Sequence, residues 1–268
     1  MNLGFRLVAF PPARSPFHPR TPLRYRPRVL NEKTWPPEAV VRLLIWIFAS
    51  VCAGMLVVSL AFPNAKDAAA DRRIWSMILG TLAFHGAGIV CVTFFIRSVR
   101  MTWREAFGIS RHGLVRAAAL GLLACAAILP IALGLSQLSG WLMQTVEVEP
   151  VAQQSVRVIQ GVTSLPLKIY FGVVAIVVAP LSEELIFRGV LYPTIKQRGY
   201  PRLALWGVSV FFAATHANVM TFIPLTILAV VLTRLYEHTG NLLAPITTHS
   251  LFNLANFLWL LLNFEPAF

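Results

Sequence analysis

Six polar side chains in the C-terminal half of the sequence could together carry out acid–base chemistry. They are Glu183, Glu184, Arg188, His216, His249 and Asn253. The residues around them are apolar enough to enter a bilayer, where each ionisable side chain costs several kcal/mol and is rarely kept without a partner or a task. The pattern therefore predicts a polar, catalytic site inside a membrane.

The two adjacent glutamates are predicted to have different surroundings. Glu184 and Arg188 are four residues apart, so on a helix they share a face and can pair. Glu183 points about 100° away on the same helix and has no evident local partner, so it is free to face a cavity. Pro180 removes a backbone hydrogen bond just before the pair and would admit water there. A structural ion pair explains Glu184 and Arg188 equally well, whereas Glu183 indicates function.

Two histidines and an asparagine add hydrogen-bonding and proton-transfer groups. His249 and Asn253 are four residues apart, so both side chains can reach one oxygen. A lone histidine on a membrane helix is more often a packing residue. Here the histidines and the glutamate pair lie on three separate apolar segments, which is harder to explain by packing. Loop or packing roles are predicted for the remaining histidines, His18, His85, His112 and His238.

Together these side chains are the groups needed to add water to an amide. A carboxylate accepts a proton from the water, an imidazole orients that water or holds a metal, and His or Asn donors stabilise the oxyanion. Two histidines and a carboxylate are also a familiar zinc ligand set, here Glu183, His216 and His249. The sequence has no His-Glu-x-x-His motif and no serine in a nucleophile context. The spacings leave metal-bound and metal-free chemistry open.

The composition indicates a polytopic membrane protein. Of the 268 residues, 57% are hydrophobic and 13% are charged, and the mean hydropathy is +0.68. A soluble domain usually carries about 25% charged residues. The net charge of +12 comes from Lys and Arg residues that flank apolar segments, a pattern of membrane orientation and not of nucleic-acid binding. Core packing, without a disulfide or ligand role, is predicted for Cys52, Cys91 and Cys125.

The apolar segments predict an all-α, polytopic bundle of about seven transmembrane helices, because one span needs about 20 apolar residues. The predicted spans are 40–62, 74–96, 114–138, 169–192, 203–219, 220–236 and 242–262. The fifth and sixth are close together and could instead form a tight or partly re-entrant hairpin. Residues 1–37 contain eight prolines and seven Lys or Arg, which predicts a disordered cytoplasmic tail before a transmembrane domain at 38–268.

Loop charges predict the orientation of the bundle. Basic residues are concentrated in the segments 1–37, 97–116 and 196–202 and at Arg234. The positive-inside rule therefore places the N-terminus in the cytoplasm and the C-terminus outside. With these span boundaries, Glu183 and His249 lie roughly 13 Å and 10 Å from the cytoplasmic face, and His216 lies nearer 20 Å, at 1.5 Å per residue. The boundaries alone do not bring the three residues level.

These motifs resemble the CAAX protease and bacteriocin-processing (CPBP) family of intramembrane proteases, also called the abortive-infection family. The family pattern is Glu-Glu-x-x-x-Arg, then Phe-x-x-x-His, then His-x-x-x-Asn on successive membrane helices. The matching residues are Glu183, Glu184 and Arg188, then Phe212 and His216, then His249 and Asn253. The resemblance covers about residues 165–258, which would form the protease core.

The resemblance implies hydrolysis of a peptide bond in a membrane-associated protein or peptide. Glu183 would activate water together with His216, while His249 and Asn253 would form the oxyanion site. Glu184 and Arg188 would support these groups. The family includes proteins described as metalloendopeptidases, and a metal-free glutamate mechanism has also been argued for it. We favour the metal-free mechanism here, with Glu183, His216 and His249 as the ligands if Zn²⁺ is present. The expected location is the bacterial plasma (inner) membrane.

Two other classes of function remain open at this point. A proton-coupled transporter could use Glu183, Arg188 and the histidines as a relay. Such a carrier is expected to show inverted repeats with paired broken helices, and none is evident in the sequence. A non-catalytic membrane immunity or scaffold protein could keep the same residues as packing groups, although the complete set of motifs speaks against it.

Overall fold

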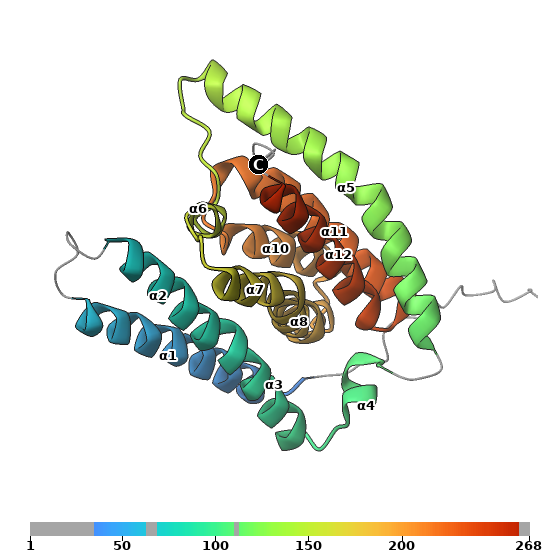
Figure 1. Cartoon of the computed structure of the whole chain (residues 1–268). Coiled ribbons are helices and arrows are strands. Elements are labelled where there is room, and N and C mark those ends of the chain that lie inside the picture. The colour runs from blue at the N-terminus through green and yellow to red at the C-terminus, as the bar shows by residue number, and fades with distance from the viewer. Residues whose placement is uncertain (1–34, 63–68, 110–112, 263–268) are drawn as a thin grey trace, which may run out of the picture.

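The structure, a computed structural model, describes residues 35–62, 69–109 and 113–262, and within these ranges every regular element is a helix (Figure 1). The prediction of an all-α bundle is therefore confirmed. The tail predicted at 1–37 lies outside the described residues except for positions 35–37, and His18 and His112 lie outside them as well.

Seven helical rods make up the described part of the bundle. The first three are α1 (Pro37–Ala61), α2 (Ala69–Thr81) with the π-helical η1 (Leu82–Gly86) and α3 (Ala87–Ser98), and α5 (Leu114–Thr145). The fourth combines α7 (Leu165–Val173), η3 (Val174–Val178), α8 (Ala179–Glu184), η4 (Leu185–Leu191) and α9 (Tyr192–Lys196). The last three are α10 (Pro201–Ala214), α11 (Val219–Thr239) and α12 (Leu243–Leu261), and the short connecting helices are α4 (Trp103–Phe107) and α6 (Gln154–Gln160).

Among the described residues, five rods are long and apolar enough to cross a bilayer, so the chain is an integral membrane protein. They are Pro37–Ala61, Asp71–Ser98, Leu114–Thr145, Leu165–Lys196 and Val219–Thr239, and each corresponds to a predicted span. α10 has only 14 residues, or ~21 Å, less than the ~30 Å of a hydrocarbon core. α12 has 19 residues, but His249, Asn253 and Asn256 lower its hydropathy. The predicted count of seven spans is therefore approximate.

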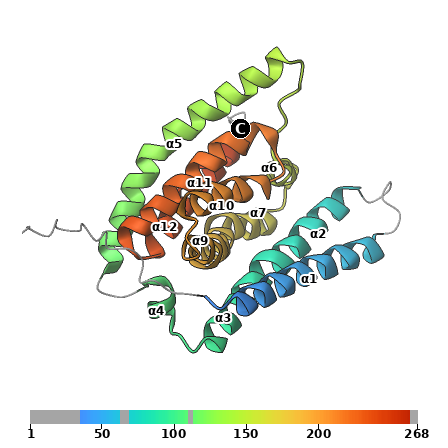
Figure 2. The ribbon, with the colours of Figure 1, turned by 180° about the vertical axis from the view of Figure 1, so that it is seen from behind.

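The fourth rod lies between two groups of helices (Figures 1 and 2). On one side α1 runs beside α2 and α3, and on the other side α5 lies along α11 and α12. The fourth rod contacts both groups, since α8 packs against η1, α3 and α12, while η4 packs against α3, α10 and α11. Large buried side chains such as Phe107, Phe212 and Leu228 fill the core around it. Polar residues on this rod are therefore surrounded by protein and not by lipid.

A close approach of two glycines fixes the start of α12, the helix that carries His249. Gly108 ends α4 with a φ of +69°, and a Cβ at this position would lie 1.8 Å from the carbonyl oxygen of Gly240. Only glycine permits that contact. The N–H of Leu242 then donates to the carbonyl of Phe107 at 2.9 Å. The first turn of α12 is thereby attached to α4.

The contact between α5 and α12 also requires a glycine. A Cβ on Gly121 would come within 2.7 Å of the Ala244 carbonyl oxygen and 2.8 Å of Thr247 Cβ. The Gly121 carbonyl accepts a hydrogen bond from the hydroxyl of Thr248 at 2.9 Å. Because His249 is the next residue, this contact sets the height and rotation at which its ring enters the bundle.

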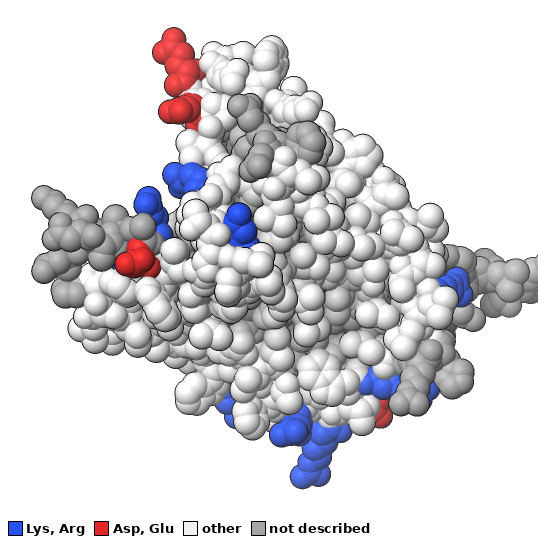
Figure 3. All heavy atoms as spheres, in the orientation of Figure 1, with Lys and Arg blue, Asp and Glu red and all other residues white. Residues whose placement is uncertain are grey.

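Charged side chains gather at the two ends of the molecule. In Figure 3, Lys and Arg residues cluster at the lower edge, where Figure 1 shows α4, and the acidic residues at the upper left are accompanied by fewer basic ones. The surface between them on this face is almost free of charge. A bilayer-spanning protein with a more basic cytoplasmic end has this distribution. The orientation itself stays a prediction.

Reporter fusions after Gln197 and after Phe268 are expected to lie on opposite sides of the membrane. The three helices α10, α11 and α12 separate the two positions, and an odd number of crossings reverses the side. Paired alkaline phosphatase and green fluorescent protein fusions measure the location of each point. Finding both fusions on one side would mean that the short α10, or the polar α12, does not cross.

Candidate active site

An irregular backbone in the fourth rod leaves one carbonyl oxygen without its helical partner, and Asn253 donates a hydrogen bond to it. In the π-helical η3, the Ala179 N–H donates to the Val174 carbonyl, five residues earlier. The next donor in this pattern would be Pro180, which has no N–H, so the Ala175 carbonyl loses this partner. Asn253 of α12 donates its Nδ2 to the Ala175 carbonyl at 2.8 Å instead. The loosening predicted at Pro180 thus takes the form of π-helical turns on either side of α8.

Glu184 is fully buried and pairs with Arg188, as their spacing predicted. Arg188 Nη1 donates to Glu184 Oε1 at 2.8 Å, and neither side chain is exposed. The guanidinium also donates to the Ala229 carbonyl at 3.1 Å and to the Thr233 hydroxyl at 3.4 Å, both on α11. It lies 4.6 Å from the centre of the Phe212 ring on α10. One buried cation therefore connects η4, α10 and α11.

The Glu184 carboxylate also orients His249. Its Oε1 lies 2.9 Å from His249 Nδ1. Opposite the Arg188 cation, Glu184 is a carboxylate and can only accept, so His249 Nδ1 must be the protonated, donating nitrogen. The Nε2 of the neutral ring then carries the lone pair, and it lies 3.7 Å from Glu183 Oε2. A carboxylate that fixes the tautomer of an imidazole in this way prepares its other nitrogen for chemistry.

Glu183 faces a cavity, as its position on the helix predicted. The residue is 9% exposed, and no described residue donates a hydrogen bond to its carboxylate. The two nearest imidazole nitrogens are His249 Nε2 at 3.7 Å and His85 Nε2 at 3.9 Å. The adjacent carboxylates thus differ in kind, because Glu184 is occupied by fixed partners while Glu183 keeps its accepting capacity.

His85 also lines this cavity, a position that its predicted packing or loop role did not anticipate. It lies in the π-helical η1, with Nδ1 2.6 Å from the Ser182 hydroxyl and Nε2 turned toward Glu183. No motif partner in the sequence marks it. The sequence signal that could have identified His85 is its position near the middle of an apolar span. An ionisable residue at such a depth was also the reason for selecting Glu183. His238, in contrast, is exposed near the end of α11.

His216 reaches the cavity from a turn and not from a helix. The predicted fifth span extended to residue 219, but α10 ends at Ala214. The ring Nδ1 donates to the Phe212 carbonyl at 2.9 Å, which leaves Nε2 as the acceptor nitrogen of the neutral ring.

The boundary of the fourth rod removes the mismatch in depth between Glu183 and His216. The rod continues to Lys196, beyond the predicted end at 192. Glu183 is 13 residues before Lys196 (196 − 183), or ~20 Å from that end. The 14 residues of α10 rise ~21 Å from the neighbouring end. Glu183 and the turn that carries His216 are therefore level.

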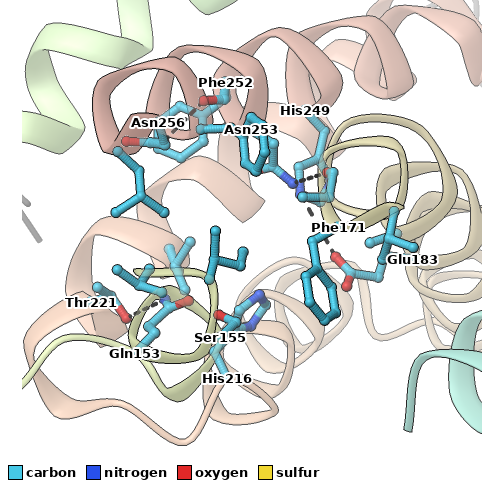
Figure 4. A pocket seen from close by; sticks show the side chains of 18 of the residues that line it. Gln153, Ser155, Phe171, Glu183, His216, Thr221, His249, Phe252, Asn253 and Asn256 are labelled. Atoms are coloured by element: carbon cyan, nitrogen blue, oxygen red, sulfur yellow. Dashed lines mark hydrogen bonds and ion pairs between the residues drawn. The ribbon is translucent and has the colours of Figure 1, made fainter. Parts of the chain in front are cut away.

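The candidate catalytic side chains line one cavity of about 360 Å³ (Figure 4). The ionisable and amide groups among them are His85, Glu183, His216, His249 and Asn253. Figure 4 shows Glu183 and His249 on one side of the space and His216 across from them. Apolar side chains such as Ile159, Leu225 and Phe257 form much of the remaining wall. Glu184 and Arg188 do not line the cavity and hold His249 from behind.

The predicted zinc ligands lie around the cavity but do not converge. Among the described residues, no three His, Cys, Asp or Glu side chains come together closely enough to hold a metal ion. Glu183, His216 and His249 all line the space, but of these two histidines only His249 pairs with the Glu183 carboxylate. A zinc site brings three or four ligands within about 2.0–2.3 Å of one point. The arrangement does not fit that requirement.

Comparisons with known proteins indicate the class of the motif-bearing segment. Residues 165–255 match the family model described as type II CAAX prenyl endopeptidase Rce1-like, so this part of the chain is similar to that family. The family resemblance indicated by the motifs is thereby confirmed, and all six predicted site residues lie in the matched range.

One curated protein is related to a short part of the chain. The uncharacterized protein YpbD of Bacillus subtilis (strain 168) is 39% identical over 72 residues, which are 25% of this chain and 34% of that protein. The chain thus spans about a third of the length of this relative. No solved structure gives a significant match.

Arg188→Ala is expected to destabilise the protein by about 3–5 kcal/mol, because Glu184 would be left buried without its cation. Arg188→Lys keeps a charge but cannot reproduce the contacts to both Ala229 and Thr233, so an intermediate loss is expected. Thermal unfolding in detergent, read as the melting temperature, measures both variants. An Arg188→Ala protein that is as stable as wild type but inactive would instead give Arg188 a direct role toward substrate.

Proposed function

We propose that the protein is an intramembrane endopeptidase that hydrolyses a peptide bond of a membrane-associated protein or peptide. The observation that carries this proposal is the Glu183 carboxylate, which is buried, lines the cavity and accepts no hydrogen bond from a described residue. Two imidazole nitrogens lie within 4 Å of it. A purely structural carboxylate at this depth would be paired in the way that Glu184 is.

In the proposed reaction Glu183 acts as the general base. A water molecule in the cavity gives one proton to the Glu183 carboxylate while its oxygen attacks the carbonyl carbon of the scissile amide. The electron pair of the carbonyl moves to its oxygen, which becomes the oxyanion. When this intermediate collapses, the carbon–nitrogen bond breaks and the leaving amine takes the proton from Glu183. His216 Nε2, an acceptor in the neutral ring, can hold the second hydrogen of the attacking water.

His249 and Asn253 are proposed to stabilise the oxyanion. Asn253 has two amide hydrogens, and one of them is used for the Ala175 carbonyl, so the other is available to an oxygen in the cavity. His249 uses Nδ1 for Glu184 and can donate from Nε2 only as an imidazolium. That cation would be stabilised by the carboxylates of Glu183 and Glu184 on its two sides. Glu183 could supply this proton to His249 Nε2 across the 3.7 Å that separate the two groups, and it would take the proton back before giving it to the leaving amine.

The surroundings of these groups favour a substrate that enters from a membrane. The cavity wall combines Phe171, Phe252 and Phe257 with Ile159 and Leu260, so it suits an apolar segment. The matched family is described as a prenyl endopeptidase, and we infer a CAAX-protease-like reaction on a membrane-bound peptide. In the mechanism written above, every proton transfer uses a side chain, and we propose that no metal is required.

Glu183→Gln is expected to reduce proteolysis by at least about 10²-fold, within the usual range of general-base catalysis, and to leave the fold intact. Glutamine keeps the size and hydrogen bonding of the side chain but cannot accept the proton of the water. Turnover of a peptide library by purified protein in detergent provides the assay. The exposed Glu149→Gln variant is the matched control and should retain wild-type turnover. Near-normal activity of Glu183→Gln would overturn the mechanism.

Asn253→Ala is expected to lower kcat by roughly 10²–10³-fold with a much smaller change in KM, as for loss of an oxyanion donor. The variant should also lose some thermal stability, because the Ala175 carbonyl loses its partner. Adding His249→Ala should cost less than the sum of the two single losses, since both groups act on one oxygen. Steady-state kinetics of the single and double variants measure this coupling.

Metal analysis accompanies these kinetics. A chelator should leave wild-type turnover unchanged if the proposed mechanism holds. Stoichiometric zinc in the purified protein, lost together with activity in His249→Ala and restored by added zinc, would replace the oxyanion assignment of His249 with a ligand role.

A further inference from the structure

The cavity has a second group of polar residues, away from Glu183, that the proposed chemistry does not use. They are Ser136 on α5, Gln153 just before α6, Thr221 on α11 and Asn256 on α12, and together they are called the far polar wall. Figure 4 shows Gln153, Thr221 and Asn256 across the space from Glu183. Gln153 Nε2 donates to the Thr221 hydroxyl at 2.8 Å, which attaches the segment before α6 to α11. The far polar wall is therefore built from several helices that pack together.

Ser136 is the unusual member of this wall. Its residue exposure is 1%, and its hydroxyl has no hydrogen-bond partner. Several threonines on these helices donate to a carbonyl four residues earlier, as Thr226, Thr233 and Thr248 do. A buried hydroxyl without a partner costs free energy. Because Ser136 lines the cavity, a molecule that occupies the cavity and displaces the side chains covering this hydroxyl can supply the missing partner.

The charge of the wall indicates which chemical groups it takes. Among the described residues that line the cavity, Glu183 is the only Asp, Glu, Lys or Arg. The far polar wall offers hydroxyl and amide groups that can both donate and accept. It is therefore suited to neutral hydrogen-bonding groups and unsuited to a phosphate, a carboxylate or an ammonium group, which would be desolvated without a counter-charge.

A peptide segment about to be cleaved exposes such neutral groups. In a membrane helix, every N–H and C=O is paired within the helix. To place a carbonyl carbon beside Glu183 the segment must be unwound, and each unwound residue then has one donor and one acceptor that need partners away from water. Resting on the proposed endopeptidase function, we propose that the far polar wall binds the unwound main chain of the substrate, with Ser136 hydrogen-bonded to one peptide group.

Ser136→Ala tests this directly, with Ser209→Ala as the matched control. Ser209 on α10 is also a fully buried serine whose hydroxyl has no partner, but it does not line the cavity. Removing either hydroxyl leaves no new unpaired group, so both variants should fold and melt like wild type. Loss of one neutral hydrogen bond to substrate should raise KM by about 3- to 10-fold in Ser136→Ala, with little change in kcat. The Ser209→Ala variant should keep both constants.

Backbone esters identify the group that Ser136 binds. A series of peptide substrates, each with one amide near the cleaved bond replaced by an ester, changes main-chain donors and acceptors and leaves the side chains intact. At one position the ester should raise KM for wild type and have no further effect in Ser136→Ala, because both changes remove the same bond. The proposal would be overturned if the effect of Ser136→Ala on KM depended on a substrate side chain and not on any ester position. Equal effects of Ser136→Ala and Ser209→Ala would overturn it as well. An unchanged KM in Ser136→Ala would do the same.

Binding measurements separate this proposal from the endopeptidase function. The peptides are bound to protein that carries Glu183→Gln, and the dissociation constant is read by fluorescence anisotropy. A weaker peptide affinity after adding Ser136→Ala supports the far polar wall as a peptide site. This holds even if the wild-type protein cleaves none of the peptides, a result that would overturn only the proposed endopeptidase function. Absence of peptide binding in the Glu183→Gln background would overturn the far polar wall as a peptide site.

Discussion

The buried contact between Arg188 and Glu184 is the interaction on which the rest of the structure depends. A cation and an anion without exposure are costly in a membrane protein unless they are paired and supported by further hydrogen bonds. Arg188 has such support from α11 and the Phe212 ring. Glu184 has it at Oε1, which also contacts His249 on α12, while its Oε2 has no partner among the described residues. The requirement to satisfy two charges thus brings four helices to one point and fixes the tautomer of the imidazole that faces Glu183.

A second constraint comes from the backbone of the fourth rod. Pro180 and the π-helical turns around it leave a carbonyl that α12 must satisfy, and Asn253 does so. One turn separates this contact from the one made by His249, so α12 is tied to the fourth rod at two heights. The family motif His-x-x-x-Asn therefore has a structural reason as well as a proposed chemical one. The cost of an interrupted helix is offset by the precise placement of the residues on both sides of the cavity.

Much of this arrangement could be predicted from sequence because it depends on local periodicity. The four-residue spacing of Glu184 and Arg188 is enough to predict that they pair. Glu183, the adjacent residue, faces another side of the helix, which is enough to predict that it does not share this pair. The apolar segments likewise locate all seven rods. His85 could not be placed, because no local pattern shows that η1 packs against α8. His216 was assigned to a helix, since hydropathy does not reveal that α10 ends early and turns inside the bundle. Ser136 carries no sequence signal, because only the folded chain shows that its hydroxyl lacks a partner.

The order of the motif residues along the chain has a consequence for biosynthesis. Arg188 and Glu184 are four residues apart on one rod, so this rod can enter the membrane with its strongest charges already matched. His249 follows Glu184 by 65 positions and arrives on the last described helix. Until that helix is synthesised and docked, Glu183 has no imidazole from α12 beside it and the Ala175 carbonyl has no amide from Asn253. The cavity is therefore completed only at the end of translation of the bundle, and a partly made chain carries the charged groups without the assembled centre.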